Sequence, residues 1–184
     1  MCDSMDFGSY RYLVLKNEVI MISAIVACDT EHGIGKNGKL PWPYHAEDMK
    51  WFRENTTDGV VVMGRKTWES IGSMKLPKRI NVILSNHPER LHGIPDRALD
   101  VAPREMGAML QNLQMEYPSK NIWVIGGGNI YAQAIPFCER LYLTKFKEAY
   151  GCDTFLDPEQ LKPYIRLVDS KNSDICSFSV WSRV

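Results

Sequence analysis

The amino-acid sequence predicts a three-layer α/β fold, in which helices flank a mostly parallel central sheet that ends in an antiparallel hairpin. The first observation is a set of β-branched runs, apolar almost throughout, at residues 21–28, 60–63, 80–84 and 122–125. Strands covered on both faces have this composition and lack polar–apolar alternation. The second observation is a set of helical patterns between and after these runs, at residues 46–55, 66–71, 103–115 and 129–134. Strands that alternate with helices indicate parallel pairing.

The first of these runs is also the most apolar stretch near the start of the chain. It extends back to Val19 and follows Lys16, so the alternative interpretation is the core of a signal peptide. The charge of Glu18 at its edge, and the polar continuation 29–33 without a small-residue cleavage site, favour a buried strand. No apolar run approaches the roughly 18 residues that a membrane-spanning helix needs.

The C-terminal part departs from strand–helix alternation. Strand character returns at residues 140–148, 165–169 and 177–183, with no long helix between the last two. The polar segment 169–174 predicts a hairpin turn, and therefore antiparallel strands at the end of the sheet.

The start of the chain fits no pattern well, and residues 10–16 are either an extra strand or part of a tail. We therefore assign one domain to residues 21–184 and an N-terminal extension of unknown role to residues 1–20.

Composition excludes several classes of function. The chain has 184 residues, and its 22 Lys and Arg balance its 22 Asp and Glu. This balance argues against a nucleic-acid or membrane-surface protein, although it allows a local basic site for a phosphorylated ligand. Five cysteines without a C-x-x-C motif fit neither a disulfide framework nor a zinc site, and favour free thiols in a reducing cytoplasm. The four scattered histidines lack metal-ligand spacing, so we expect no metal.

Two segments after the first strand could form part of an active site. Three glycines in six residues, at 33–38, argue against a helix or strand interior and predict a loop that ends at Pro41 and Trp42. That loop is either a lid over a pocket or a plain surface loop. In the helix that follows, Asp48 lies four residues before Phe52 and so on the same, apolar face. Its carboxylate either serves a ligand or interacts with the helix dipole.

Two further segments suggest sites for phosphate. The buried strand 60–63 ends at Gly64, and Arg65 and Lys66 open the next helix, where cations are unfavourable unless an anion binds. The strand 122–125 is likewise followed by glycines, at 126–128, although these do not form the G-x-G-x-x-G fingerprint. Two such strand ends on one sheet suggest a dinucleotide at its carboxyl edge.

With these segments in place, the sequence closely resembles the dihydrofolate reductase family from Met21 to about Val184. The matching motifs, in chain order, are Gly33-Ile-Gly with Leu40-Pro-Trp42, Asp48-x-x-Trp-Phe52, Val62-Met-Gly-Arg65-x-Thr-Trp-Glu-Ser-Ile-Gly72, Leu76-Pro-x-Arg79, Ile83-Leu-Ser85, Ile125-Gly-Gly-Gly-x-x-Tyr131 and Leu141-Tyr-Leu-Thr144. The resemblance implies a dihydrofolate-reductase-like fold and an enzyme that uses NADPH to reduce dihydrofolate to tetrahydrofolate. Its ligands would be dihydrofolate and antifolate inhibitors.

The resemblance also implies which residues form each part of the site. Catalysis would fall to Asp48, Trp42 and Thr144. The substrate site would comprise Ile25, Val26, Ala27, Asp48, Met49, Phe52, Thr67, Ile71, Arg79, Tyr131 and Thr144. The NADPH site would comprise Ala27, Ile34, Gly35, Lys39, Leu40, Trp42, Gly64, Arg65, Lys66, Thr67, Leu84, Ser85, Asn86, Ile125, Gly126, Gly127, Gly128, Asn129, Ile130 and Tyr131.

Several of these implied roles are specific. Asp48 would bind the amidine edge of the pterin by two hydrogen bonds, supported by the Thr144 hydroxyl and a water. Arg79 would bind the carboxylate of the glutamate tail, and Arg65 the extra ribose phosphate that distinguishes NADPH from NADH. The segment 33–42 would be the lid, and the peptide bond between Gly126 and Gly127 would be cis.

The resemblance leaves open how the substrate is protonated. Asp48 would lie at the amidine edge, away from the nitrogen beside the hydride-accepting carbon. We therefore expect a water admitted under the lid to donate the proton, while Asp48 acts through its field, with a pKa raised by desolvation.

Two features depart from the family pattern. Cys152 stands where a glycine is frequent, which puts the hydrogen bonds between its loop and the lid in doubt. The segment 73–75 is longer than in many relatives, so affinity for the substrate tail and for inhibitors is open. Two other functions also stay open: a related pterin or pyrimidine reductase, and a non-catalytic NADPH- or folate-binding protein. We expect a monomer because no exposed apolar stripe is evident.

Overall fold

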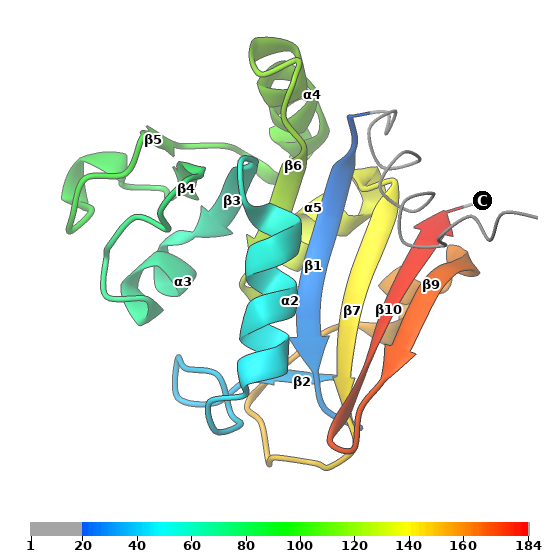
Figure 1. Ribbon diagram of the computed structural model, residues 1–184. Coiled ribbons are helices and arrows are strands. Elements are labelled where there is room, and N and C mark those ends of the chain that lie inside the picture. The colour runs from blue at the N-terminus through cyan, green and yellow to red at the C-terminus, as the bar shows by residue number, and fades with distance from the viewer. Residues whose placement is uncertain (1–19, 184) are drawn as a thin grey trace, which may run out of the picture.

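The computed structural model describes residues 20–183, so the possible strand at 10–16 lies outside the described residues. A sheet of eight strands forms the centre of the molecule (Figure 1). Its strands, from one edge to the other, are β5 (Arg97–Leu99), β4 (Ile80–Leu84), β3 (Val60–Gly64), β6 (Ile122–Gly126), β1 (Ile22–Cys28), β7 (Arg140–Phe146), β10 (Cys176–Arg183) and β9 (Tyr164–Asn172). The strands from β5 to β7 are parallel, and β10 is antiparallel to both of its neighbours. The predicted α/β sheet is therefore confirmed.

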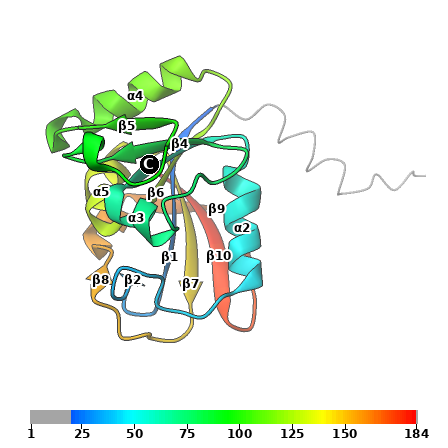
Figure 2. The same cartoon turned by 90° about the vertical axis from the view of Figure 1, so that its left-hand side faces the viewer.

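Helices cover both faces of this sheet, which gives the three predicted layers. Figure 2 shows α2 (Ala46–Thr56) and α5 (Gly128–Ala134) on opposite sides. Alternate residues of β1 pack into two cores: Ala24 joins the core under α4 (Met106–Glu116) and α5, and Ile25 joins the core under α2 and α3 (Arg65–Ser70). The inner strands β1, β3, β4 and β6 are mostly apolar because both of their faces are buried.

The C-terminal hairpin is confirmed, but its turn lies later than predicted. β9 continues to Asn172, so most of the polar segment 169–174 belongs to a strand. The polar side chains are compatible with this strand because β9 is at the edge of the sheet and every residue after Tyr164 is exposed.

A second, two-stranded sheet corrects the expectation for the glycine-rich segment. Gly33–Gly35 forms β2, which pairs antiparallel with β8 (Thr154–Phe155). The glycines are compatible with a strand here because β2 is only three residues long and its neighbour packs tightly: a Cβ on Gly33 would lie 2.3 Å from Cys152 Sγ. Other differences are small: the predicted helix at 103–115 begins as a 3-10 turn at Pro103–Glu105, and the short strand β5 was missed.

Within residues 20–183, no helix is long and apolar enough to cross a membrane. The described cysteines, Cys28, Cys138, Cys152 and Cys176, are all free thiols.

Candidate active site

Asp48 lies in the first turn of α2, and its side chain is only 7% exposed. The helix begins after His45, whose Nδ1 accepts a hydrogen bond from the Asp48 backbone N–H at 3.3 Å. The neighbouring polar side chain on the sheet is Thr144 of β7, which is 1% exposed and donates its hydroxyl hydrogen bond to the Asp48 carboxylate. Thr144 pairs in register with Ala27 on β1. Helix and sheet thus bring together Asp48, Ala27 and Thr144, which are far apart in the sequence.

The environment of Asp48 raises the pKa of its carboxyl group. The main cause is desolvation by burial, which disfavours the charged form. The hydrogen bond from Thr144 and the proximity of His45 oppose this effect only in part. A buried carboxylate with one side-chain donor has room for a further hydrogen-bonding partner, and a planar amidine is a partner of the required charge.

The predicted apolar wall around Asp48 is only partly as expected. Ile25, Phe52 and Ile71 belong to the core between the sheet and helices α2 and α3, on the Asp48 side. Val26 points the other way, into the core under α4 and α5, so its side chain is not part of this wall. The reason is the alternation of side chains along a strand. Met49 is 37% exposed, at the edge of the wall.

Trp42 anchors the end of the predicted lid. Its ring is 6% exposed and stacks on Phe146, with centroids 4.3 Å apart, and Tyr150 meets it edge-on at 5.8 Å. The buried indole Nε1 of Trp42 has no hydrogen-bond partner within the described residues. A buried N–H of this kind is normally satisfied, so this atom is suited to hold a water or a ligand.

Arg79 lies at the opposite end of α2 from Asp48. Its Nε donates to Thr56 Oγ1 at 2.8 Å, and its terminal nitrogens donate to the carbonyls of Pro77 at 2.6 Å and Arg53 at 3.3 Å. The guanidinium also lies over the Phe52 ring, 5.7 Å from its centroid. Among the described residues, three of its five N–H groups are therefore engaged, and two remain for a ligand.

The two strand–glycine–helix junctions are neighbours on the sheet. Gly64 ends β3 and precedes α3, Gly126 ends β6, and Met63 pairs in register with Gly126. The bond between Gly126 and Gly127 is cis, as the resemblance implied. Thr67 of α3 faces the second junction, because its Oγ1 lies 3.2 Å from where a Cβ on Gly127 would be.

At Gly64 and Gly126 a side chain would collide with residues of α5. A Cβ on Gly64 would lie 2.9 Å from Ile130 Cγ1, and one on Gly126, whose φ is +105°, would lie 2.8 Å from the Tyr131 ring. Helices α3 and α5 begin directly after Gly64 and Gly127 without a capping side chain, so the N–H groups of their first turns are available to the phosphates of a dinucleotide. NADPH thus fits the residues that are present.

The other predicted cofactor residues lie around the same edge. Leu84 ends β4 and Ser85 follows it; both are buried, whereas Asn86 is exposed. Arg65 and Lys66 are exposed at the start of α3, and Arg65 makes a two-fold hydrogen bond to Glu69 at 2.7 and 2.9 Å. The remaining predicted positions belong to β6 or α5, namely Ile125, Gly128, Asn129, Ile130 and Tyr131.

Tyr131 has a structural contact that the sequence did not indicate. Its hydroxyl is buried and donates to the carbonyl of Ile25 on β1 at 2.7 Å. This hydrogen bond fixes α5 against β1, beside the cis peptide.

The predicted lid is a short hairpin. Lys36 and Lys39 exchange backbone hydrogen bonds of 2.9 and 3.0 Å around Asn37 and Gly38, which both have positive φ. Lys39 and Leu40 are exposed, and Ile34 reaches the second glycine junction, where its Cδ1 lies 3.7 Å from the Cβ position of Gly128.

Asp29 fixes the base of this hairpin, and sequence reasoning missed it. The side chain is fully buried, and its two oxygens accept hydrogen bonds from the backbone N–H groups of Glu31 (2.9 Å), Gly33 (2.7 Å) and Tyr150 (3.0 Å). These bonds lower its pKa, despite burial. Cys152 Sγ is 3.4 Å from the same carboxylate.

Asp153 forms a second set of hydrogen bonds with the hairpin, at its tip. Its Oδ2 accepts from the Asn37 N–H at 2.6 Å, and its own N–H donates to Gly35 at 3.0 Å. The bonds to the hairpin are therefore present although Cys152 replaces glycine. The only sequence signal was the position of Asp29 and Asp153 beside strand ends.

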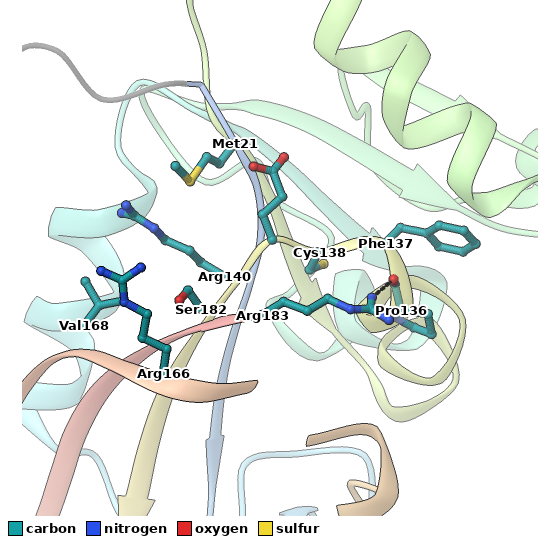
Figure 3. Close-up of a pocket in the computed structure, with 10 residues that line it drawn as sticks. Met21, Pro136, Phe137, Cys138, Arg140, Arg166, Val168, Ser182 and Arg183 are labelled. Atoms are coloured by element: carbon teal, nitrogen blue, oxygen red, sulfur yellow. Dashed lines mark hydrogen bonds between the residues drawn. The ribbon is translucent and has the colours of Figure 1, made fainter. Parts of the chain in front are cut away.

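A pocket of about 650 Å³ lies at the opposite end of the sheet (Figure 3). It is lined by Met21, by residues 136–140, which lead into β7, by Arg166 and Val168 of β9 and by the last residues of β10, and it contains none of the predicted site residues. Within residues 20–183, no group of three or more His, Cys, Asp or Glu side chains could hold a metal ion.

Comparisons with known proteins agree with this geometry. The family model described as dihydrofolate reductase matches residues 21–181. A protein of Human herpesvirus 8 type P (isolate GK18) is 41% identical over 157 residues, which cover 78% of this chain and 72% of that protein. The dihydrofolate reductase of Haemophilus influenzae (strain ATCC 51907 / DSM 11121 / KW20 / Rd) is 34% identical over 167 residues, which cover 88% and 98%.

A solved structure extends this likeness to the fold. Dihydrofolate reductase from Enterococcus faecalis, complexed with NADP(H) and RAB-propyl, superposes with a TM-score of 0.74 at 26% identity, and the match covers 89% of this chain and 96% of that one. Sequence, fold and site lead to the same conclusion: this chain belongs to the dihydrofolate reductase family, whose members are NADPH-dependent oxidoreductases.

Proposed function

We propose that Asp48 binds the amidine edge of dihydrofolate and promotes its reduction to tetrahydrofolate. The observation that carries this proposal is the burial of its carboxylate beside Thr144, in a wall that is otherwise apolar. In such surroundings two charge-assisted hydrogen bonds to one planar partner are strong and fix its orientation. Thr144 supports the carboxylate through its hydroxyl.

Protonation of the substrate is the step that the chain must promote. A neutral imine accepts hydride poorly, so a proton on the adjacent nitrogen accelerates the reaction. Asp48 lies at the other edge of the ring, and a water admitted under the lid delivers the proton while the carboxylate favours the cationic pterin through its field. The Trp42 Nε1 hydrogen is available to hold a water there.

NADPH supplies the hydride when it is bound. The glycine junctions at Gly64 and at 126–128 receive its phosphates, and Arg65 and Lys66 receive the extra ribose phosphate. Glu69 already pairs with Arg65, so the guanidinium shares its N–H groups or exchanges partners there. The hairpin 33–39 and Trp42 exclude bulk water from the reacting rings.

The length of α2 fits an extended substrate. Asp48 and Thr56 are eight residues apart, which is a rise of about 12 Å along a helix. The pterin lies at the Asp48 end, and Arg79 at the Thr56 end binds the tail carboxylate with its two remaining N–H groups. Antifolate inhibitors use the same pterin site.

The decisive experiment replaces Asp48 with asparagine. In Asp48→Asn we expect the hydride-transfer rate with dihydrofolate to fall by about 100-fold or more, because the field and the charge-assisted bonds are lost. Stopped-flow absorbance of NADPH measures this rate, and fluorescence titration should show unchanged NADPH affinity. Glu47→Gln, at the exposed neighbouring position, is the matched control and should react normally.

Near-normal hydride transfer in Asp48→Asn would contradict the proposed role. If the unmodified enzyme oxidises NADPH with another pterin or a pyrimidine but not with dihydrofolate, it is a related reductase. Binding of NADPH and folate without any turnover would indicate a non-catalytic protein.

A further inference from the structure

Two buried polar side chains form hydrogen bonds with Arg79, and neither belongs to the predicted site. Thr56 and Asn81 are both fully buried. The Thr56 hydroxyl donates to the Phe52 carbonyl at 2.8 Å and accepts from Arg79 Nε at 2.8 Å. Its hydrogen is therefore directed into the helix, and its lone pair faces the guanidinium.

Asn81 holds the backbone from which Arg79 extends. Its Oδ1 accepts from the Leu76 N–H at 2.9 Å, and its Nδ2 donates to the carbonyls of Leu76 and Arg79, both at 3.1 Å. Asp96 Oδ2 accepts from the Asn81 backbone N–H at 2.8 Å and from Nδ2 at 3.3 Å. One side chain thus closes the loop 76–79 into a fixed shape.

We propose that Thr56 and Asn81 are positioning residues that aim the two free N–H groups of Arg79 at the substrate, and thereby set the preference for folates that carry a glutamate tail. This inference rests on the proposed function, in which Arg79 binds the tail carboxylate. A flexible arginine loses much of its binding energy to ordering, whereas a guanidinium held by three hydrogen bonds is ordered before the ligand arrives.

The test compares two ligands that differ only in the tail. Folate carries the glutamate and pteroate lacks it, and calorimetry gives the dissociation constant of each for the full-length protein. In Thr56→Val, which keeps the shape but removes the hydroxyl, we expect folate to bind roughly tenfold more weakly. Pteroate binding should change less than twofold. Thr56→Ser keeps the hydroxyl and should restore folate binding.

Asn81→Asp provides a second variant with an independent contact. It keeps the acceptor for Leu76 but loses the donors to the two carbonyls and to Asp96, and its carboxylate repels that of Asp96, so the loop is released and folate binding should again weaken selectively. Lys75→Gln breaks only the exposed salt bridge from Lys75 to Asp96 and serves as its control, with folate binding unchanged. Thermal unfolding identifies any variant that does not fold. If Asn81→Asp does not fold, the result for Thr56→Val tests the proposal by itself.

A double-mutant cycle shows whether the effect passes through Arg79. In an Arg79→Gln background, Thr56→Val should weaken folate binding no further. The inference is overturned if Thr56→Val leaves folate binding intact, weakens pteroate equally, or adds its full effect to Arg79→Gln. If the unmodified protein does not bind folate more tightly than pteroate, it is the assignment of Arg79 in the proposed function that fails.

Discussion

Burial of the Asp48 carboxyl group lowers the stability of the folded protein at neutral pH. Its pKa is raised in the folded protein, chiefly by desolvation, so the folded state holds the proton more tightly than the unfolded chain does. The stabilising contribution of this group is present below the ordinary pKa of an aspartate and is lost as the pH rises through the raised value. At neutral pH this buried carboxyl group therefore makes the fold less stable than it is in acid.

We accordingly expect Asp48→Asn to be more stable than the unmodified protein at pH 7. The difference in the free energy of unfolding should shrink as the pH falls to about 4 and below. Urea unfolding at a series of pH values measures it, with Glu47→Gln as the control for an exposed carboxylate. A difference that grows on acidification would show that the environment does not disfavour the charge.

At this scale the sequence indicated the residues that we propose to bind ligands better than the residues that fix those side chains in place. Asp48 was recognisable because it shares a helix face with Phe52. Asp29 was not, because its role depends on Tyr150, 121 positions away. Thr56 and Asn81 look like ordinary polar residues in a helix and a strand until their partners are known.

Among the elements, the hairpin 33–39 packs closely against the loop that contains Cys152. The Cβ of an alanine at Gly33 would lie 2.3 Å from Cys152 Sγ and 2.5 Å from Cys152 Cβ. The backbone of Gly33 has an ordinary φ, so space alone requires glycine here.

We therefore expect Gly33→Ala to lower stability by about 1–3 kcal/mol, as overpacked sites do. Adding Cys152→Gly should restore most of the loss, because it removes both clashing atoms. Gly35→Ala is the control: its Cβ would meet nothing closer than 3.5 Å and should be tolerated. Chemical denaturation of the four proteins checks this, and equal losses in the single and double variants would contradict it.

The sequence predicted those strands and helices whose own residues carry a clear apolar pattern. The strands β1, β3, β4 and β6 were visible as apolar runs because both faces are buried. The short strands β2, β5 and β8 depend on partners that are distant in the sequence, and periodicity over two or three residues carries no signal.

Across the whole molecule, β9 is an exposed edge strand of the sheet, and such edges can pair with a second copy. β9 exposes Ile165, Leu167 and Val168, an apolar group that the sequence did not reveal. Its pairing with β10 shifts register so that Val168 has no partner there, and charged side chains such as Lys171 interrupt the edge. Irregular, charged edge strands discourage pairing between molecules.

We expect the protein to be a monomer at micromolar concentration. Sedimentation velocity measures this directly, and a concentration-dependent dimer would show that β9 pairs despite its irregular register. The sequence predicted the layers, the strand directions and the hairpin at one edge of the sheet, but not β5 at the other edge, which is only three residues long.

Because α2 carries Asp48 in its first turn and Thr56 at its end, this single helix would set the distance between the two substrate contacts that we propose. Inserting one residue between them would lengthen the helix by about 1.5 Å and turn its far end by roughly 100°. Substitutions can therefore change either contact separately, whereas the distance between the two contacts changes only if the helix itself is lengthened or shortened.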